Sequence, residues 1–85
     1  EPPVLSWGPT VIKGSGAITL SLRGKTMVRF RVYDPTGRVA EEPCSGILPA
    51  GLYRIPWGKD LPSGVYFLRL ELGEEVFGTK SLILR

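Results

Sequence analysis

The side chains that most often perform chemistry are scarce in this chain. It has 85 residues, no histidine and one cysteine, Cys44. A Ser-His-Asp or Cys-His catalytic constellation therefore cannot be assembled, and a metal site would lack its commonest ligands. The two aspartates, Asp34 and Asp60, both precede turns with proline and glycine, where aspartate usually caps backbone amides. The acidic pairs at residues 41–42 and 74–75 supply too few oxygens in one loop for calcium.

These residues predict that the chain is not an enzyme and that it uses no cofactor, metal or small-molecule substrate. Cys44 lies in a segment rich in proline and glycine, Pro43-Cys44-Ser45-Gly46, which we expect to be a loop. No basic residue next to it in sequence would lower the pKa of the thiol. A half-buried small residue is therefore the favoured interpretation of Cys44, ahead of a reactive thiol.

The charge pattern does not favour a nucleic-acid partner. The formal net charge is +3, and the clustered Arg23, Lys25, Arg29 and Arg31 alternate with apolar residues at strand spacing. No aromatic platform or glycine-rich phosphate loop accompanies them, so they indicate a solvated strand face. A carbohydrate-binding face built from exposed aromatic residues remains a weaker alternative, because Trp57, Tyr53 and Tyr66 fall on predicted core faces.

Hydrophobic periodicity predicts an all-β protein. Eleven glycines and eight prolines separate short runs of β-branched, aliphatic and aromatic residues, and no window keeps an apolar stripe at helical spacing. The expected strands are 4–7, 10–13, 17–22, 27–33, 38–42, 52–57, 65–72 and 76–84. Seven or eight short strands at this spacing favour an immunoglobulin-like antiparallel β-sandwich of about seven strands.

One domain accounts for the whole length, because 85 residues build a single modest core. We expect the sandwich to cover residues 4–85 and residues 1–3 to be the remnant of a linker. The chain does not begin with methionine, and its one methionine is Met27, which indicates a piece of a longer precursor. The mean hydropathy is +0.07, and no apolar run approaches the roughly 18 residues that a membrane helix needs.

Alternation along each strand assigns side chains to the core, because successive residues point to opposite faces of a sheet. The side chains expected to point inward are Ile18, Leu20, Leu22, Val28, Phe30, Val32, Tyr53, Ile55, Trp57, Tyr66, Leu68, Leu70, Leu72, Leu82 and Leu84. Ile83 is expected to face solvent together with Arg85. Pro56 lacks a backbone donor, so its strand should lie at a sheet edge or bulge there.

Turn chemistry predicts two hairpins and one corner. Asp34-Pro35-Thr36-Gly37 has the residues of a capped tight turn between two strands. The segment Leu72-Gly73-Glu74-Glu75 should join the last two long strands as antiparallel neighbours. Gly64 follows Pro62-Ser63 and should adopt a positive φ where the chain turns into the next strand.

Several motifs, in order, resemble those of a known family. A strand ends in Val32-Tyr33-Asp34 and is followed by Gly37-Arg38-Val39, then by Pro49-Ala50-Gly51 and a strand closed by Trp57. The run Leu61 to Tyr66 and a last strand with Lys80 before alternating aliphatic residues complete the series. In these motifs the chain resembles the C-terminal sorting domain (type A) of type IX secretion cargo and the related immunoglobulin-like domain of flagellar hook-capping proteins.

The resemblance implies a folded secretion signal on a larger protein. Its partners would be an outer-membrane translocon, a cell-surface sortase and the upstream cargo domain of the same precursor. The protein would then be secreted, or held at the cell surface, after crossing the periplasm of a Gram-negative-type bacterium. The residues expected to serve sorting and partner recognition are Gly64, Val65, Tyr66, Lys80, Leu82, Leu84 and Arg85.

Strand pairing suggests how such a signal could be read. We expect the last strand to offer unpaired backbone groups that a partner could extend, with Lys80 and Arg85 as exposed charges on that edge. The alternative function is a structural or interaction module, an immunoglobulin-like spacer attached to a secreted hydrolase or a hook-capping protein. Two segments depart from the family's usual motifs, Trp7-Gly8-Pro9-Thr10 near the start and Gly58-Lys59 after Trp57. The resemblance is therefore less specific in the N-terminal half of the chain.

Overall fold

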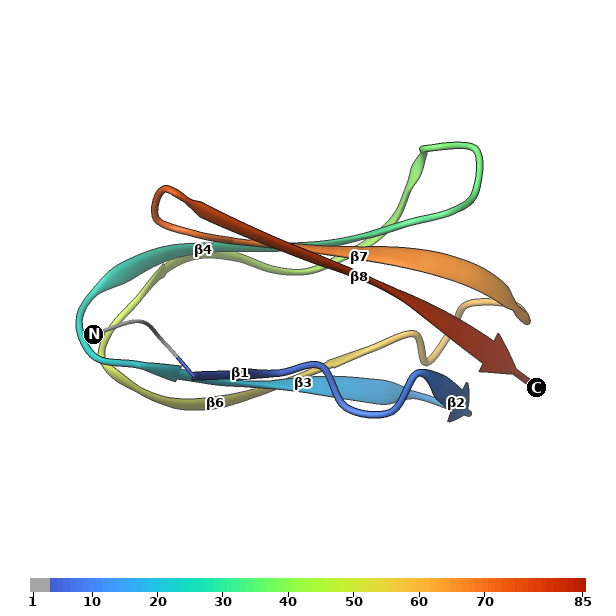
Figure 1. Cartoon of the computed structure of the whole chain (residues 1–85), viewed down its shortest axis with the longest axis horizontal. Coiled ribbons are helices and arrows are strands. Elements are labelled where there is room, and N and C mark those ends of the chain that lie inside the picture. The colour runs from blue at the N-terminus through green and yellow to red at the C-terminus, as the bar shows by residue number, and fades with distance from the viewer. Residues whose placement is uncertain (1–3) are drawn as a thin grey trace.

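The computed structural model describes residues 4–85, which form two β-sheets packed face to face (Figure 1). The expected linker, residues 1–3, lies outside the described residues. The strands are β1 (Val4–Ser6), β2 (Val11–Lys13), β3 (Gly16–Leu22), β4 (Thr26–Tyr33), β5 (Val39–Leu48), β6 (Gly51–Trp57), β7 (Gly64–Leu72) and β8 (Glu75–Leu84). The predicted all-β class is therefore confirmed, with eight strands rather than seven. None of the described residues forms a helix of the length and hydropathy needed to cross a membrane.

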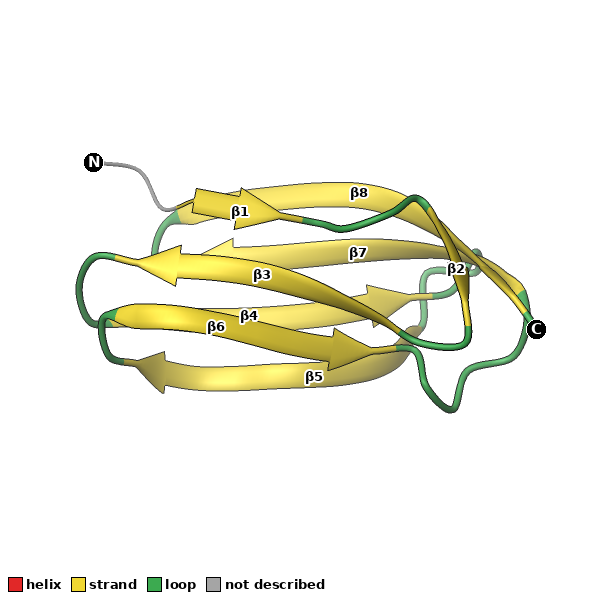
Figure 2. Ribbon diagram, turned by 90° about the horizontal axis from the view of Figure 1, so that it is seen from below, coloured by secondary structure: helices red, strands yellow, loops and turns green. Residues whose placement is uncertain are grey.

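The strand order is that of an immunoglobulin-like sandwich. One sheet has the order β1-β3-β6 and the other has the order β2-β8-β7-β4-β5. The eighth strand arises because the first strand is split: β1 pairs with β3 in one sheet, and β2 crosses to pair with β8 in the other. The β2–β8 pairing is parallel, whereas every other pair is antiparallel (Figure 2). The structure is thus an antiparallel sandwich closed at one edge by a short parallel strand.

The core lies between the two sheets and follows the predicted alternation in β3, β4 and β7. All ten residues expected to face inward from these three strands are buried. In β6, Ile55 and Trp57 are buried and Tyr53 is half-buried against the core. Pro56 lies in β6, an edge strand that pairs only with β3, as its missing donor predicts.

The facing of the last strand differs from the sequence prediction. Ile83 is fully buried, whereas Leu84 is 44% exposed and Leu82 is half-buried. The strand contains three aliphatic residues in a row, so alternation alone supports either facing. Register with β7 decides between them, because Leu82 lies opposite Val65, which faces away from the core. Ser81 lies on the same side of β8 as Ile83 and is therefore buried too. Its hydroxyl donates a hydrogen bond of 2.9 Å to the carbonyl of Thr10.

Both predicted hairpins are present. In the β4–β5 turn the Gly37 amide donates to the Asp34 carbonyl, and the Asp34 carboxylate accepts from the Thr36 amide, the Thr36 hydroxyl and the Arg38 amide. Gly37 has a φ of +89°, a value that favours glycine. The β7–β8 hairpin closes through Gly73 and Glu74, with Leu72 opposite Glu75.

A tyrosine corner begins β7. The Tyr66 hydroxyl donates a 2.7 Å hydrogen bond to the carbonyl of Pro62, four residues earlier. The same contact begins β6, where the Tyr53 hydroxyl donates to the Pro49 carbonyl at 2.7 Å. In each corner a glycine two residues before the tyrosine has a positive φ, +154° at Gly51 and +157° at Gly64. The positive φ predicted for Gly64 is therefore confirmed.

The segment expected to be a loop around Cys44 is part of a strand instead. β5 continues through residues 43–46 to Leu48, pairing with β4 along the way. The sandwich tolerates proline and glycine here because β5 is the outer strand of its sheet and carries a register shift opposite Val32. Cys44 lies opposite Phe30 and is half-buried against the core, which confirms the favoured interpretation of its burial.

Candidate functional site

The residues expected to serve recognition come together at one end of the five-stranded sheet. Gly64, Val65 and Tyr66 begin β7, and Lys80, Leu82 and Leu84 lie in the second half of β8. The two strands are antiparallel, so the start of one lies beside the end of the other, with Val65 opposite Leu82. Figure 1 shows this end near the chain's C-terminus. The site is therefore one region of the surface, although its members play different parts.

Four of these residues are available at the surface. Val65, Lys80 and Leu84 are exposed and Leu82 is half-buried, all on the outer face of the sheet. Tyr66 points the other way and is 5% exposed, so its hydroxyl holds the corner and its ring fills the core. We conclude that Tyr66 and Gly64 shape this end of the molecule, whereas Val65, Lys80, Leu82 and Leu84 can contact a partner.

The expectation of an open edge along the end of the last strand is wrong. Leu82, Ile83 and Leu84 pair with β7 on one side and with β2 on the other, where their partners are Val11, Ile12 and Lys13. The amide of Leu82 also donates to the Thr10 carbonyl at 2.8 Å. A partner could therefore extend the sheet at these residues only after displacing β2. Sequence periodicity alone did not predict that β2 pairs with β8.

Arg85 is held by the molecule and is not a free edge charge. Its guanidinium donates hydrogen bonds to the carbonyls of Gly58, Lys59 and Leu61, the last at 2.8 Å. Its backbone amide donates to the Ser63 hydroxyl at 2.8 Å. Arg85 thus fastens the end of the chain to the β6–β7 connection. Its side chain therefore acts as a structural clamp.

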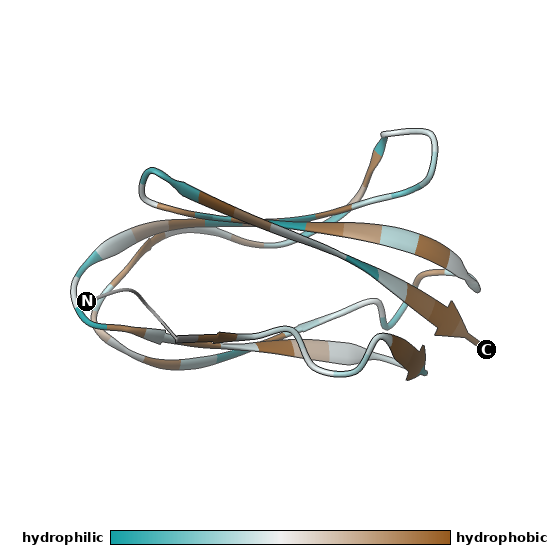
Figure 3. Cartoon of the chain, viewed as in Figure 1, coloured by the Kyte–Doolittle hydropathy of each residue, from teal (hydrophilic) through white to brown (hydrophobic). Residues whose placement is uncertain are grey.

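An outer apolar patch surrounds the exposed recognition residues. We define it by the outward-facing residues at this end of the sheet: Val11, Tyr33, Val39, Val65, Phe67, Leu82 and Leu84. Phe67 is 43% exposed and lies directly opposite both Tyr33 and Lys80. Figure 3 colours the ends of β2 and β8 and part of β7 as hydrophobic. Sequence reasoning missed Phe67 as a site residue, although its parity with Val65 already placed it on the outer face.

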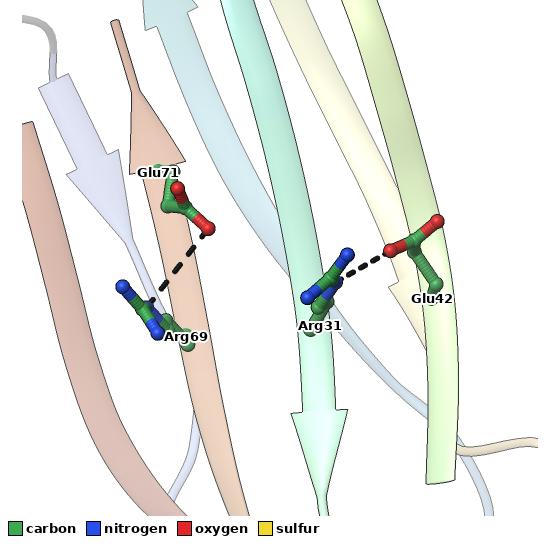
Figure 4. A network of polar contacts seen from close by, with 4 residues as sticks. All are labelled: Arg31, Glu42, Arg69 and Glu71. Carbon is green, nitrogen blue, oxygen red and sulfur yellow. Dashed lines mark hydrogen bonds and ion pairs between the residues drawn. The ribbon is translucent and has the colours of Figure 1, made fainter. Parts of the chain in front are cut away.

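A charged band crosses the middle of the same outer face (Figure 4). Arg31 donates from its Nε to Glu42 at 2.6 Å, and the Arg69 Nε lies 3.9 Å from a Glu71 carboxylate oxygen. The hydrogen bond to Glu42 raises the pKa of Arg31 above its ordinary value. Arg31 and Arg69 lie opposite each other, so the two glutamates offset a like-charge pair. The band separates the outer apolar patch from the other end of the sheet.

Chemistry at other places is limited by the residues present. Burial raises the pKa of the Cys44 thiol, which disfavours the reactive thiolate. Among residues 4–85, no group of three or more cysteine or acidic side chains is arranged to hold a metal ion. A hollow of about 500 Å³, lined by Lys13, Gly14, Leu84 and Arg85, opens beside the outer apolar patch.

Comparison with known proteins does not assign a family. No protein-family model matches the chain, and no significant match was found among curated proteins. Function must therefore be argued from the fold and from the surface at the β7–β8 end.

Proposed function

We propose that this chain is a sorting domain of the type IX secretion kind, which directs an attached secreted protein across the outer membrane to the cell surface or the medium. An immunoglobulin-like fold alone does not specify this role, because the fold serves many functions. The support comes from where the family-like motifs lie. β4 ends at Tyr33, just before Asp34, the run Leu61 to Tyr66 leads into β7, and Lys80 to Leu84 form the end of β8.

Three of these motif segments, distant in sequence, lie at one end of the sandwich, whereas Pro49-Ala50-Gly51 lies at the opposite end, where Gly51 pairs with Leu22. Tyr33 lies opposite Phe67, and Val65 lies opposite Leu82. Trp57, another motif residue, is buried, and a β-carbon added at the next residue, Gly58, would lie 3.1 Å from the Ile83 side chain. This convergence is the observation that carries the proposal, since a folded signal must present its recognition residues together on one rigid surface.

In this role the domain acts as a binding module. Val65, Lys80, Leu82 and Leu84 form the exposed part of the surface that the translocon would contact. The Tyr66 corner and the Arg85 clamp hold that surface in one conformation. The further partners in this proposal are the upstream cargo domain and a cell-surface sortase, and the localisation is the cell exterior, reached through the periplasm.

Export of a reporter tests the proposal. The 85-residue chain is fused behind a reporter that carries an N-terminal secretion signal, in a bacterium with a type IX translocon. We expect the reporter outside the cell, and we expect it in the periplasm when the domain is absent or when the translocon is deleted. Retention of the fusion in the periplasm would contradict the proposal if the domain is folded and an established cargo signal is exported from the same host.

A spacer module is the second candidate function. The observation that favours it is the outer apolar patch, because an exposed apolar surface of this kind also suits packing against a neighbouring domain. In the export experiment this candidate predicts no translocon-dependent release. It also predicts that fusing the neighbouring domain protects Phe67 and Val65 from solvent, which hydrogen exchange and aromatic NMR signals can measure.

A further inference from the structure

We infer that the outer apolar patch is a docking site for an extended protein segment that carries large apolar side chains interleaved with carboxylates. The inference does not depend on the sorting function. Its first basis is exposure: Phe67 and Leu84 are 43% and 44% exposed, and Val11 is 48% exposed, on three different strands of one sheet. Contiguous exposed apolar side chains of this kind commonly mark binding surfaces.

Charge defines the chemistry of the occupant. Lys80 lies opposite Phe67 and Lys13 lies opposite Leu84, so each lysine borders the patch. Neither lysine forms an ion pair with any residue of the described range 4–85. The residues that define the patch include no carboxylate, and the nearby Asp34 carboxylate already accepts three hydrogen bonds within its own turn. An occupant with carboxylates beside its apolar side chains would complement this border.

Size and shape favour a segment over a second copy of the chain. With strands about 4.8 Å apart and about 3.3 Å per residue, the patch covers on the order of 300 Å². A stable dimer buries about 800 Å² on each partner. A two-fold dimer through this patch would also bring the lysines of both copies together, which is unfavourable. The hollow beside Leu84 and Lys13 suits a protruding side chain better than the flat surface of a membrane.

Peptide binding to the 85-residue chain tests the inference. The probe is a synthetic peptide in which phenylalanine and glutamate alternate, and its partner has lysine in place of every glutamate. We expect the acidic peptide to bind at least tenfold more tightly than the basic one, with backbone NMR shifts concentrated at Val65, Phe67 and Leu82. Added salt should weaken binding, because the lysines are exposed.

Matched variants locate the site. Phe67→Ser should weaken binding of the acidic peptide at least tenfold. Val76→Ser should change it less than twofold, because Val76 is also exposed on the outer face but lies outside the patch, opposite Glu71 of the charged band. Lys80→Glu should reverse the preference toward the basic peptide. Circular dichroism and melting of each variant establish that it is folded, so that a lost signal reports binding alone.

The inference would be overturned by equal binding of the two peptides, by shifts centred away from the patch, by an equal effect of Phe67→Ser and Val76→Ser, or by no binding of the acidic peptide to the folded chain. Vesicles of phosphatidylcholine and phosphatidylserine supply the membrane comparison, and binding to them without binding to the acidic peptide would also overturn it. Self-association abolished by Phe67→Ser would assign the patch to a second copy and reject the proposed occupant.

Discussion

Tyr66 and Tyr53 make the same hydrogen bond in two environments. Each hydroxyl donates to the carbonyl of a proline four residues earlier, but Tyr66 is buried and Tyr53 is only half-buried. The underlying sequence repeat, Pro-x-Gly-x-Tyr, occurs at residues 49–53 and 62–66. Each copy turns the chain into a strand, so a five-residue pattern determines where β6 and β7 begin.

We therefore expect Tyr66→Phe to lower the free energy of unfolding by about 1 kcal/mol, the usual net contribution of one hydrogen bond. Tyr53→Phe is the matched control. It should cost less, because water can replace the lost partner at the more exposed corner. Urea denaturation of both variants measures the difference. Equal losses would mean that burial does not strengthen the Tyr66 corner.

The ionisation of Asp34 makes the stability of the β4–β5 turn depend on pH. The hydrogen bond from the Thr36 hydroxyl, with those from the Arg38 and Thr36 amides, lowers the pKa of Asp34 below its ordinary value of 3.8. A lowered folded-state pKa means that the carboxylate stabilises the fold above the unfolded-state value and that this stability is lost as pH falls through the folded-state pKa.

Asp34→Asn should accordingly lower the melting temperature at pH 7, and the gap from the native chain should narrow as pH falls below about 3.8. Melting followed by circular dichroism between pH 2 and pH 7 measures the gap. Asp60→Asn serves as the control, because no described residue donates a hydrogen bond to that carboxylate. A gap that stays constant with pH would reject the role of the charged Asp34 side chain.

In β8, the register of pairing with β7 determines which side chains face the core. Its three consecutive aliphatic residues allow either parity, yet Val65 opposite Leu82 directs Ile83 into the core. We expect Ile83→Ala to cost about 2 to 5 kcal/mol, as for other buried aliphatic truncations. Leu84→Ala, at an exposed position, should cost less than about 1 kcal/mol. Chemical denaturation measures the loss of unfolding free energy in both variants. A larger loss for Leu84→Ala than for Ile83→Ala would show that Leu84 is the core residue.

The end of β8 is fastened by the Arg85 clamp. Arg85→Ser removes donors to three carbonyls of the β6–β7 connection, so the amide hydrogen of Leu61, which donates to the Gly58 carbonyl, should exchange faster with solvent. Arg85→Lys keeps the charge but lacks the planar fork, so it should restore only part of the protection. Hydrogen exchange followed by NMR measures both variants. Unchanged hydrogen exchange in Arg85→Ser would show that the β6–β7 connection keeps its structure without the Arg85 hydrogen bonds.

For the whole molecule, the pairing between distant strands sets the folding behaviour. β2 and β8 pair although the Ser81 and Thr10 that join them are 71 residues apart. Sandwiches with such non-local contacts fold in milliseconds to seconds. We expect the isolated chain to unfold in one cooperative transition, with a sheet-type circular dichroism spectrum and refolding on that timescale. A helical or disordered spectrum would contradict the fold.

Local patterns in the sequence determined most of the fold. The alternation in β3, β4 and β7 identified their buried residues, because a half-buried strand repeats every two residues and a slip of one would expose the whole set. The turn at Asp34 and the hairpin at Gly73 were predictable because their chemistry lies within a few residues. The motif residues from Leu61 to Tyr66 and from Lys80 to Leu84 also fall at the β7–β8 end, which carries the exposed surface.

Tertiary structure alone decided the features that join distant residues. The facing of Ile83 depends on register with β7, the closed edge of β8 depends on β2, and the clamp depends on Arg85 reaching residues 58–61. None of these contacts produces a periodic pattern in the sequence, because the residues around each partner are also compatible with other strand pairings. The outer apolar patch has the same origin, since its side chains come from five strands, β2, β4, β5, β7 and β8, that span most of the chain.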